Sequence, residues 1–248
     1  MSGFYFKVYE LLPALLKSRI NPLEDAVCRF VSGAAAVGPN AVIVDAGAGQ
    51  SRFAELFGSH RYVALDFGRG DGGWDYSQLD VVGDLQHLPL KTGCAAAVIN
   101  TQVLEHLPEP GRALREIHRI LEPGGRLLLT APQGWHEHQQ PHDYYRFTRF
   151  ALECLLAGAG FESWTIEPIG GYFHYLGHRL TYIPKVLFWP RAKVLRVLLF
   201  PIELMSVALF CFLGPLLCYY LDRFDRDQEF TLCYRCLARK GKGRGDVS

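Results

Sequence analysis

Two glycines follow a short apolar run in the segment VIVDAGAGQSRF and could let the backbone pass close to a ligand. They are Gly47 and Gly49, and Asp45 precedes them, where it could orient the turn. We expect a helix to begin after this turn, with its first N–H groups free to face a bound group. A glycine pair alone also suits a plain tight turn, so its meaning depends on its neighbours.

Further carboxylates end the next two apolar runs. Asp66 lies 21 residues after Asp45, where a carboxylate can accept both hydroxyls of a cofactor ribose. Asp84 ends the third run, where its side chain or backbone could meet an adenine amino group. Each residue could instead cap a helix. Acidic residues at three successive strand ends nevertheless favour a ligand that contains a nucleoside.

The glycine turn lacks the marks of two other nucleotide sites. Dehydrogenases favour a third glycine for close helix packing, and Arg52 stands at that position. A Walker lysine motif is also absent from the sequence, so a triphosphate ligand is not supported.

The elements that must position these residues alternate between short apolar runs and amphipathic stretches from Ala41 onward. This alternation predicts an α/β fold, with a doubly wound and mostly parallel sheet. One crossover helix should begin at Pro110 and end at Gly124-Gly125, and the next should begin after Thr148 as its N-cap.

Four regions follow from this pattern. Residues 1–40 should form an N-terminal helical cap, with Tyr5 and Val8 on the apolar face of its first helix, and residues 41–168 the cofactor-binding domain. Residues 169–228 are an apolar helical insertion, and residues 229–248 hold a final strand and a basic tail.

The segments DAGAG, ALDF, GDLQHLPL, NTQVLEHLPEP and LREIHRILEPGGRLLLTAP, in this order, resemble the class I S-adenosylmethionine-dependent methyltransferases. The resemblance implies a Rossmann-like seven-stranded sheet, with the hydrophobic insertion before its last strand. It also implies S-adenosylmethionine as the cofactor. The residues to which it gives cofactor-binding roles are Asp45, Gly47, Gly49, Asp66, Asp84, Leu85 and Gln102.

The segment PQGWHEHQQPHDYYRFT follows the fifth run and should form the acceptor loop, because ligands of open α/β sheets sit at the carboxyl ends of the strands. The candidate catalytic residues are His142 or Asp143 as a base, with Tyr145 beside them. Alternatively, Asp143, Tyr145 and Arg146 form a hydrogen-bonded, ion-paired hinge. The loop histidines have no fixed chelating geometry, so no metal is expected. His106 is expected to be a core histidine.

The blocks PHDYYRFT and IGGYFHYLGHRL resemble a narrower set of bacterial methyltransferases, encoded among polysaccharide and glycolipid functions. This second resemblance implies O-methylation of a sugar or a lipid-linked glycan, in polysaccharide biosynthesis. Two alternatives stay open: methylation of a soluble or quinone-like small molecule, and an inactive scaffold with the cofactor fold.

The insertion contains 18 uncharged residues, Leu204 to Leu221, close to the ~20 that span a bilayer. A single span would separate the final strand from its sheet. The insertion is therefore either a hairpin that dips into one leaflet, bent at Gly214-Pro215, or a soluble lid that packs on the domain or on a second subunit. We expect peripheral membrane contact through residues 183–221, anchored by Lys185, Phe188, Trp189, Arg191, Lys193, Arg196, Tyr219 and Tyr220.

The bulk composition limits partners and location. With 26 basic and 25 acidic residues, no global field attracts nucleic acid. Seven scattered cysteines suit reduced thiols, and Cys233 and Cys236 lack the second pair that a metal site needs. The first residues lack the features of a secretory signal, so the expected location is cytoplasmic, on the inner face of the membrane.

Overall fold

A computed structural model of the chain describes residues 11–70, 73–187 and 193–242. The chain divides into two compact units. Residues 27–167 and 233–248 form the sheet unit, and residues 1–26 and 168–232 form the helical unit. The boundary at residue 26 falls inside the region 1–40, for which the sequence predicts one cap. Tyr5 and Val8 of that predicted cap lie outside the described residues.

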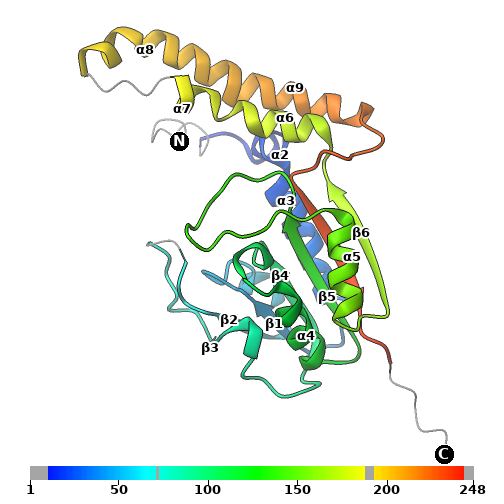
Figure 1. Cartoon of the computed structure of the whole chain (residues 1–248). Helices are drawn as coiled ribbons and strands as arrows, with labels where there is room; N and C mark the ends of the chain where they lie inside the picture. Colours follow the sequence, from blue (N-terminus) through cyan, green and yellow to red (C-terminus); the bar gives the residue numbers. More distant parts are fainter. Residues whose placement is uncertain (1–10, 71–72, 188–192, 243–248) are drawn as a thin grey trace, which may run out of the picture. The chain divides into compact units, whose positions relative to one another are not determined.

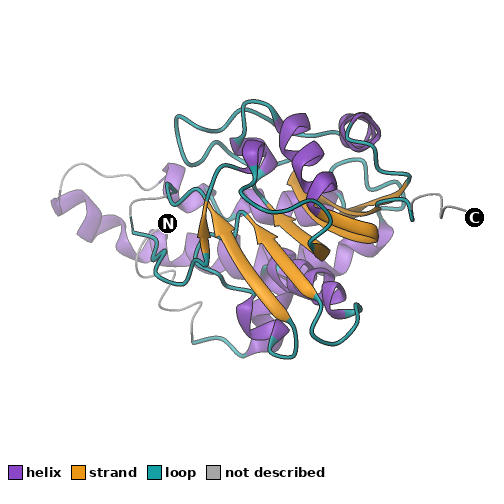
Figure 2. Ribbon diagram, turned by 90° about the horizontal axis from the view of Figure 1, so that it is seen from below, coloured by secondary structure: helices purple, strands orange, loops and turns teal. Residues whose placement is uncertain are grey.

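The sheet unit is built on seven strands in the order β3-β2-β1-β4-β5-β7-β6, and Figure 2 shows them side by side. Strands β1 to β5 pair in parallel, and β7 is antiparallel to β5. This confirms the predicted Rossmann-like, mostly parallel sheet. The strands are β1 Val42–Ala46, β2 Arg61–Asp66, β3 Val81–Val82, β4 Ala95–Thr101, β5 Leu121–Pro132, β6 Ser163–Ile169 and β7 Cys233–Arg239.

The central strands are apolar because both of their faces are covered, as is usual for a parallel sheet. All seven residues of β4 are buried. Helix α4 (Pro110–Ile120) buries Ala113, Leu114, Ile117 and Ile120, which recur at helical spacing. Helix α5 (Arg149–Gly158) begins as predicted, because the Thr148 side chain accepts a hydrogen bond from the Ala151 N–H.

Two predicted helix boundaries in this unit are wrong. Helix α4 ends at Ile120 rather than at Gly124, because Leu121 already pairs with Ala95 as the first residue of β5. After the glycine turn the chain forms no α-helix but a short 3-10 helix, η2 (Ala54–Phe57). The N–H groups of the turn itself have partners within the fold: those of Gly47 and Ala48 donate to the Leu65 carbonyl, and that of Gly49 donates to the Asp66 carboxylate.

The remaining helices of this region are short. Helix α3 (Pro22–Ser32) buries Val27 and Val31. The other 3-10 helices are η1 Gly33–Ala35, η3 Leu85–His87 and η4 Leu104–His106.

The helical unit contains α2 (Ala14–Ile20) and a long helical segment before the last strand. That segment consists of α6 Tyr172–Leu180, α7 Ile183–Leu187, α8 Lys193–Val207, the π-helical η5 Ala208–Leu213, α9 Gly214–Leu221 and the 3-10 helix η6 Asp222–Phe224. Helix α6 packs along α9, as Figure 1 shows. Its N-terminus is held by Asp222, whose carboxylate accepts hydrogen bonds from the N–H groups of Gly171 and His174.

The chain stays helical through Gly214-Pro215, from Leu199 to Phe224, so the helix does not end at the position of the predicted bend. The π-helical turn directly before Gly214 changes the hydrogen-bond pattern where Pro215 has no N–H to donate. Among the described residues this is the one helix long and apolar enough to cross a membrane. The expected anchors Phe188, Trp189 and Arg191 lie outside the described residues, and the side chains of Lys193 and Arg196 are not described either.

Candidate functional site

The glycine turn between β1 and η2 has a conformation that requires glycine. Gly47 and Gly49 have φ angles of 93° and 54°, in the left-handed region. The Gly47 N–H donates to the Leu65 carbonyl at 2.8 Å, so the turn is tied to the end of β2. A Cβ atom on Gly47 would overlap the side chain of Val103. The turn is therefore both strained for other residues and closely packed against the loop after β4.

Asp66, the last residue of β2, joins the glycine turn to the loop that follows the strand. Its carboxylate accepts one hydrogen bond from the Gly49 N–H at 2.9 Å and another from the Gly68 N–H at 2.8 Å. A carboxylate offers about four lone-pair positions, so two remain for other donors. Asp66 is half-buried. This position and free capacity suit the two ribose hydroxyls that the sequence assigns to it.

Asp45, within β1, is a buried carboxylate with unused capacity. One oxygen accepts a hydrogen bond from the Tyr62 hydroxyl at 2.6 Å, and the other has no partner among the described residues. Burial raises the pKa of Asp45 to about 7. A cationic ligand group at the free oxygen would stabilise the carboxylate. Tyr62 was not predicted, although its polar tip in the otherwise apolar run RYVALDF is a visible signal.

Residues at the end of β4 also contact the segment that leads into the glycine turn. The Asn100 side chain is fully buried, and its amide donates to the Ala46 carbonyl at 2.6 Å. Asn100 was also not predicted, but it is the one amide in the apolar run AAAVINT. Gln102 has a φ of 55°, and its backbone N–H donates to the Thr130 carbonyl at 3.0 Å. It therefore lies between the ends of β4 and β5, at the edge of the sheet that carries the glycine turn.

Asp84 and Leu85 lie at the start of η3. The Asp84 carboxylate accepts a hydrogen bond from the Gln86 N–H at 2.8 Å, and this is the capping geometry that the sequence left open as an alternative. Leu85 is buried. Because β3 pairs with β2, both residues follow the strand next to Asp66.

Trp74 contributes an aromatic surface to the glycine turn that no motif indicated. A Cβ atom on Gly49 would lie 3.0 Å from the indole ring, so the ring rests directly on this glycine. Trp74 is still 37% exposed. The ring can therefore cover one side of a ligand held at the turn.

In the acceptor loop, Asp143 and Arg146 form a two-pronged ion pair with both oxygen–nitrogen distances at 2.7 Å. The hydrogen bond from Arg146 holds the pKa of Asp143 well below its usual range. A carboxylate held so firmly in its ionised form is a weak base. Asp143 also accepts a hydrogen bond from the His138 N–H at 2.8 Å. This geometry favours the hinge interpretation for Asp143 and Arg146.

Tyr145 contacts that pair through its backbone, since its carbonyl accepts a hydrogen bond from Arg146 at 2.6 Å. The His142 ring nitrogen Nδ1 lies 2.9 Å from the Tyr144 hydroxyl, and His142 is exposed. The Tyr145 hydroxyl donates to the Pro108 carbonyl at 2.8 Å. Of the three predicted catalytic residues, His142 thus has the most accessible titratable group, and Tyr145 holds the loop to the segment before α4.

Glu105, in η4, is the most deeply buried acid near this loop. Its side chain is fully buried, and neither oxygen has a hydrogen-bond partner among the described residues. Burial raises the pKa of Glu105 to about 8. The neighbouring His106 is partly buried, and burial lowers its pKa.

These residues fit S-adenosylmethionine. The free positions of Asp66 can accept from a ribose diol, and the buried carboxylate of Asp45 lies directly before the two glycines of the turn. Two carboxylates at the turn favour a cation over a pyrophosphate. The sheet unit therefore has donors and acceptors of the right charge for this cofactor.

Comparison with known proteins agrees with this fit. Residues 44–129 match the family model described as a methyltransferase domain. The chain is 30% identical over 147 residues to a protein of Mycolicibacterium smegmatis described as "Probable S-adenosylmethionine-dependent methyltransferase", covering 54% of this chain and 56% of that protein. The chain spans about half or less of the length of the curated relatives it matches.

Solved structures show the same fold at low sequence identity. The [4+2]-cyclase SpnF has a TM-score of 0.57 at 18% identity, over 88% of this chain and 82% of that one. A phosphoethanolamine N-methyltransferase of Haemonchus contortus, solved with S-adenosylhomocysteine, has a TM-score of 0.52 at 13% identity, over 88% and 52%. Residues 44–129 thus match a methyltransferase domain, and the solved structures share the fold of this chain.

Proposed function

We propose that the whole chain is an S-adenosylmethionine-dependent methyltransferase that O-methylates a sugar or a lipid-linked glycan at the cytoplasmic face of a membrane. The observation that carries the methyltransferase part is the pair of hydrogen bonds that the Asp66 carboxylate accepts from Gly49 and Gly68. They fix the glycine turn and leave acceptor positions of the carboxylate for a ribose.

In methyl transfer the protein contributes mainly by positioning the cofactor and the acceptor. When bound, S-adenosylmethionine supplies a methyl group on a positively charged sulfur. The glycine turn and Asp66 hold the cofactor, and the acceptor loop presents the acceptor at the same edge of the sheet. A hydroxyl acceptor must also lose a proton, and we assign this step to His142, whose ring is exposed and oriented by Tyr144.

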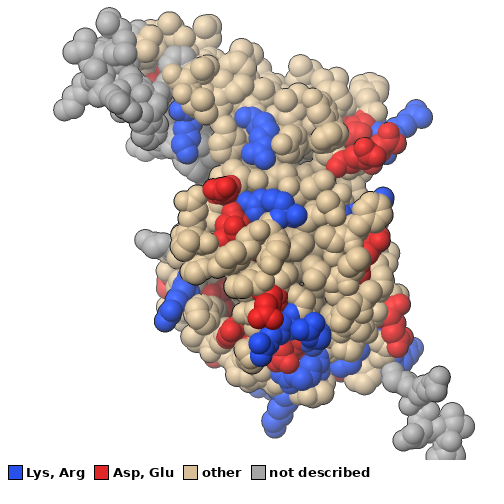
Figure 3. Space-filling model, in the orientation of Figure 1, with Lys and Arg blue, Asp and Glu red and all other residues tan. Residues whose placement is uncertain are grey.

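The long helix of the helical unit supports an acceptor in a lipid environment. Ile202, Met205, Leu209, Leu213 and Leu217 recur every three or four residues and are each 48–66% exposed. They form one apolar stripe, which we call the α8–α9 stripe. The surface along this helix carries few charged side chains in Figure 3. An apolar stripe of this length is unusual on a surface that only meets water.

The cofactor is tested by calorimetric titration of the purified protein with S-adenosylmethionine and, separately, with NAD. We expect a micromolar-scale constant, ~−8 kcal/mol, for S-adenosylmethionine and no heat of binding for NAD. The two carboxylates at the turn explain this difference, because they attract a sulfonium and an ammonium and repel a pyrophosphate. Binding of neither compound would support the inactive scaffold instead.

The membrane contact is tested by flotation with vesicles that contain anionic lipid. We expect the wild-type protein to float, and the double variant Leu213→Lys/Leu217→Lys to bind vesicles at least ~10-fold more weakly, because each lost leucine contact is worth ~1.5 kcal/mol or more. Phe150→Lys is the matched control, since it adds a lysine at an exposed apolar position of α5.

A different outcome would identify another acceptor class. Wild-type protein that stays with the soluble fraction contradicts the membrane proposal. Methylation of a soluble or quinone-like small molecule then becomes the leading function, with a second copy of the chain as the candidate cover for the α8–α9 stripe.

A further inference from the structure

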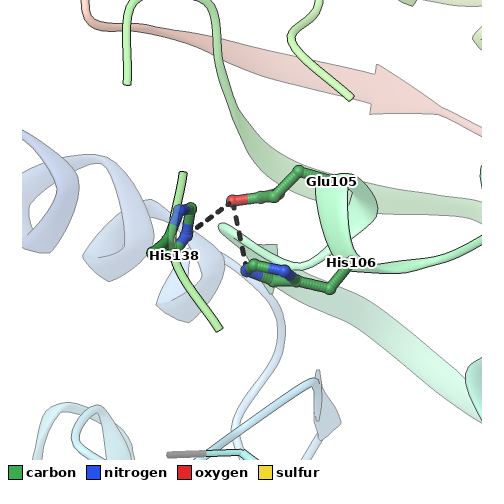
Figure 4. A group of neighbouring side chains, drawn as sticks. All are labelled: Glu105, His106 and His138. Atoms are coloured by element: carbon green, nitrogen blue, oxygen red, sulfur yellow. Dashed lines mark ion pairs between the residues drawn. The ribbon is translucent and has the colours of Figure 1, made fainter. Parts of the chain in front are cut away.

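Glu105 and two histidines from different segments meet at the edge of the acceptor loop (Figure 4). His106 follows Glu105 in η4, and His138 lies in the loop after β5. The Nε2 atom of His106 is 3.9 Å from a Glu105 oxygen, and that of His138 is 4.0 Å from the same oxygen. Their ligand atoms all lie within 4.8 Å of one another. Three potential ligands thus converge on one point.

The remaining ring nitrogens fix how the two histidines are protonated. The Nδ1 atom of His106 lies 2.6 Å from the His142 carbonyl oxygen, and that of His138 lies 3.0 Å from the His136 carbonyl oxygen. A carbonyl oxygen can only accept, so each Nδ1 must carry the hydrogen. In the neutral rings both Nε2 lone pairs then face the Glu105 carboxylate. With Glu105 ionised, the cluster would consist of acceptors that face one another, and none of the three would donate.

Such an arrangement needs a positive species at its centre. Neither oxygen of the buried Glu105 has a hydrogen-bond partner among the described residues, and His106 Nε2 has none either. The nearby Asp143 and Arg146 cancel each other's charge, so an ionised Glu105 would give the cluster a net negative charge. A proton or a metal cation can occupy the centre.

We propose that Glu105, His106 and His138 bind a divalent transition-metal ion of the zinc type. Two imidazoles and one carboxylate are an established ligand set for Zn²⁺. Tetrahedral bonds of about 2.0–2.1 Å place ligand atoms ~3.3 Å apart. The two distances to Glu105 must therefore contract by roughly 0.6 Å, and no ligand pair by more than about 1.5 Å, to close the site. The perpendicular rings of His106 and His138 allow this approach from two sides.

The hydrogen bonds of the second ring nitrogen of each histidine match those of ligand histidines in metal sites. Ligand histidines normally donate their other N–H to a carbonyl or a carboxylate, as both do here. Asp143 adds to this at His138, where it accepts the backbone N–H and lies 3.4 Å from Nδ1. The firmly ionised Asp143 thus acts as a positioning residue for His138. The ion would join the acceptor loop to η4 and leave a position open, which, if the proposed function holds, an acceptor oxygen can take.

The test is titration of chelator-treated full-length protein with Co²⁺, followed by its absorption spectrum, and with Zn²⁺ in competition. We expect one equivalent of ion with a d–d band of nitrogen and oxygen ligands. Glu105→Gln and His138→Gln should each weaken binding at least ~100-fold, as loss of a ligand exceeds the 10–100-fold effect of an outer contact. His87→Gln, at an exposed histidine outside the cluster, should leave binding unchanged.

Two results would overturn the metal site: no stoichiometric binding by the wild type, or equal binding by the wild type and His138→Gln. A shared proton then occupies the centre. His138→Gln keeps the test decisive should Glu105→Gln fail to fold, because His138 lies in a loop. Titration of the same samples with S-adenosylmethionine separates this result from the proposed function, since the cofactor ligands lie at the glycine turn and not in this cluster.

Discussion

Replacement of Asp66 by alanine should abolish measurable binding of S-adenosylmethionine. If the proposed function holds, the variant loses the acceptor for two ribose hydroxyls, and a hydrogen bond to a charged group is worth ~1.5–3 kcal/mol. It also leaves the N–H groups of Gly49 and Gly68 without their acceptor, so the turn loses its fixed shape. Both effects act on the cofactor, and we expect calorimetry to show affinity at least ~100-fold below wild type.

A carboxylate on the same loop provides the control for Asp66. Asp75 is exposed, and its carboxylate accepts a hydrogen bond from the nearby Ser77 N–H at 2.9 Å. Asp75→Ala should therefore bind the cofactor as the wild type does. An Asp66→Ala protein with a native circular dichroism spectrum and unchanged affinity would remove Asp66 from the cofactor site.

Replacement of Gly47 by alanine should damage both the stability of the sheet unit and its cofactor binding. The new Cβ would overlap Val103, and the φ of 93° is unfavourable for any L-residue. Strain of this kind costs ~1–3 kcal/mol, and overpacking costs a similar amount. We expect the free energy of unfolding to fall by ~2–5 kcal/mol in urea titrations, with cofactor affinity reduced as the turn shifts.

Gly58 is the matched control, because an added Cβ there meets no atom within 4 Å and its φ is −55°. Gly58→Ala should be neutral or stabilising by up to ~1 kcal/mol, through the lower entropy of its unfolded chain. Equal effects of the two substitutions would contradict the packing that the structure shows at Gly47.

The fold was predictable because its signals are local and repeated. Apolar runs of strand length alternate with amphipathic stretches, and parallel strands admit few arrangements of such a pattern. The N-cap at Thr148 was legible for the same reason, since the capping contact with Ala151 spans one turn. The boundary at Ile120 was not, because the pairing of Leu121 with Ala95 depends on a strand distant in sequence.

The site was predictable where a backbone conformation requires one residue type. Gly47 and Gly49 were predicted to form a tight turn, and their positive φ angles explain why glycine stands at both positions. The contact of Glu105 with His138 joins residues of two segments, and neither segment alone has ligand spacing. The sequence also could not decide between the base and hinge roles of Asp143. The two hydrogen bonds from Arg146, which lower the pKa of Asp143, are visible only in the structure.

The similarity to a cyclase shows that this fold does not by itself determine the reaction. The structure of SpnF shares this architecture and is described by a cyclisation rather than by methyl transfer. Proteins of similar fold can therefore catalyse different reactions, and the residues at the strand ends determine which reaction occurs. For this chain, the titrations with the cofactor and with metal ions address those residues directly.

The two ends of the segment inserted between β6 and β7 lie close together. Strands β6 and β7 are neighbours in the sheet, and the Thr231 hydroxyl donates to the Ile169 carbonyl at 3.0 Å, so the two ends of the insertion meet. In topological terms, the long apolar helix occupies the place of a hairpin loop. Evolution could lengthen, shorten or exchange such a loop without altering the order of the strands. The proposed membrane contact could therefore change in evolution independently of the glycine turn and the strands that position it.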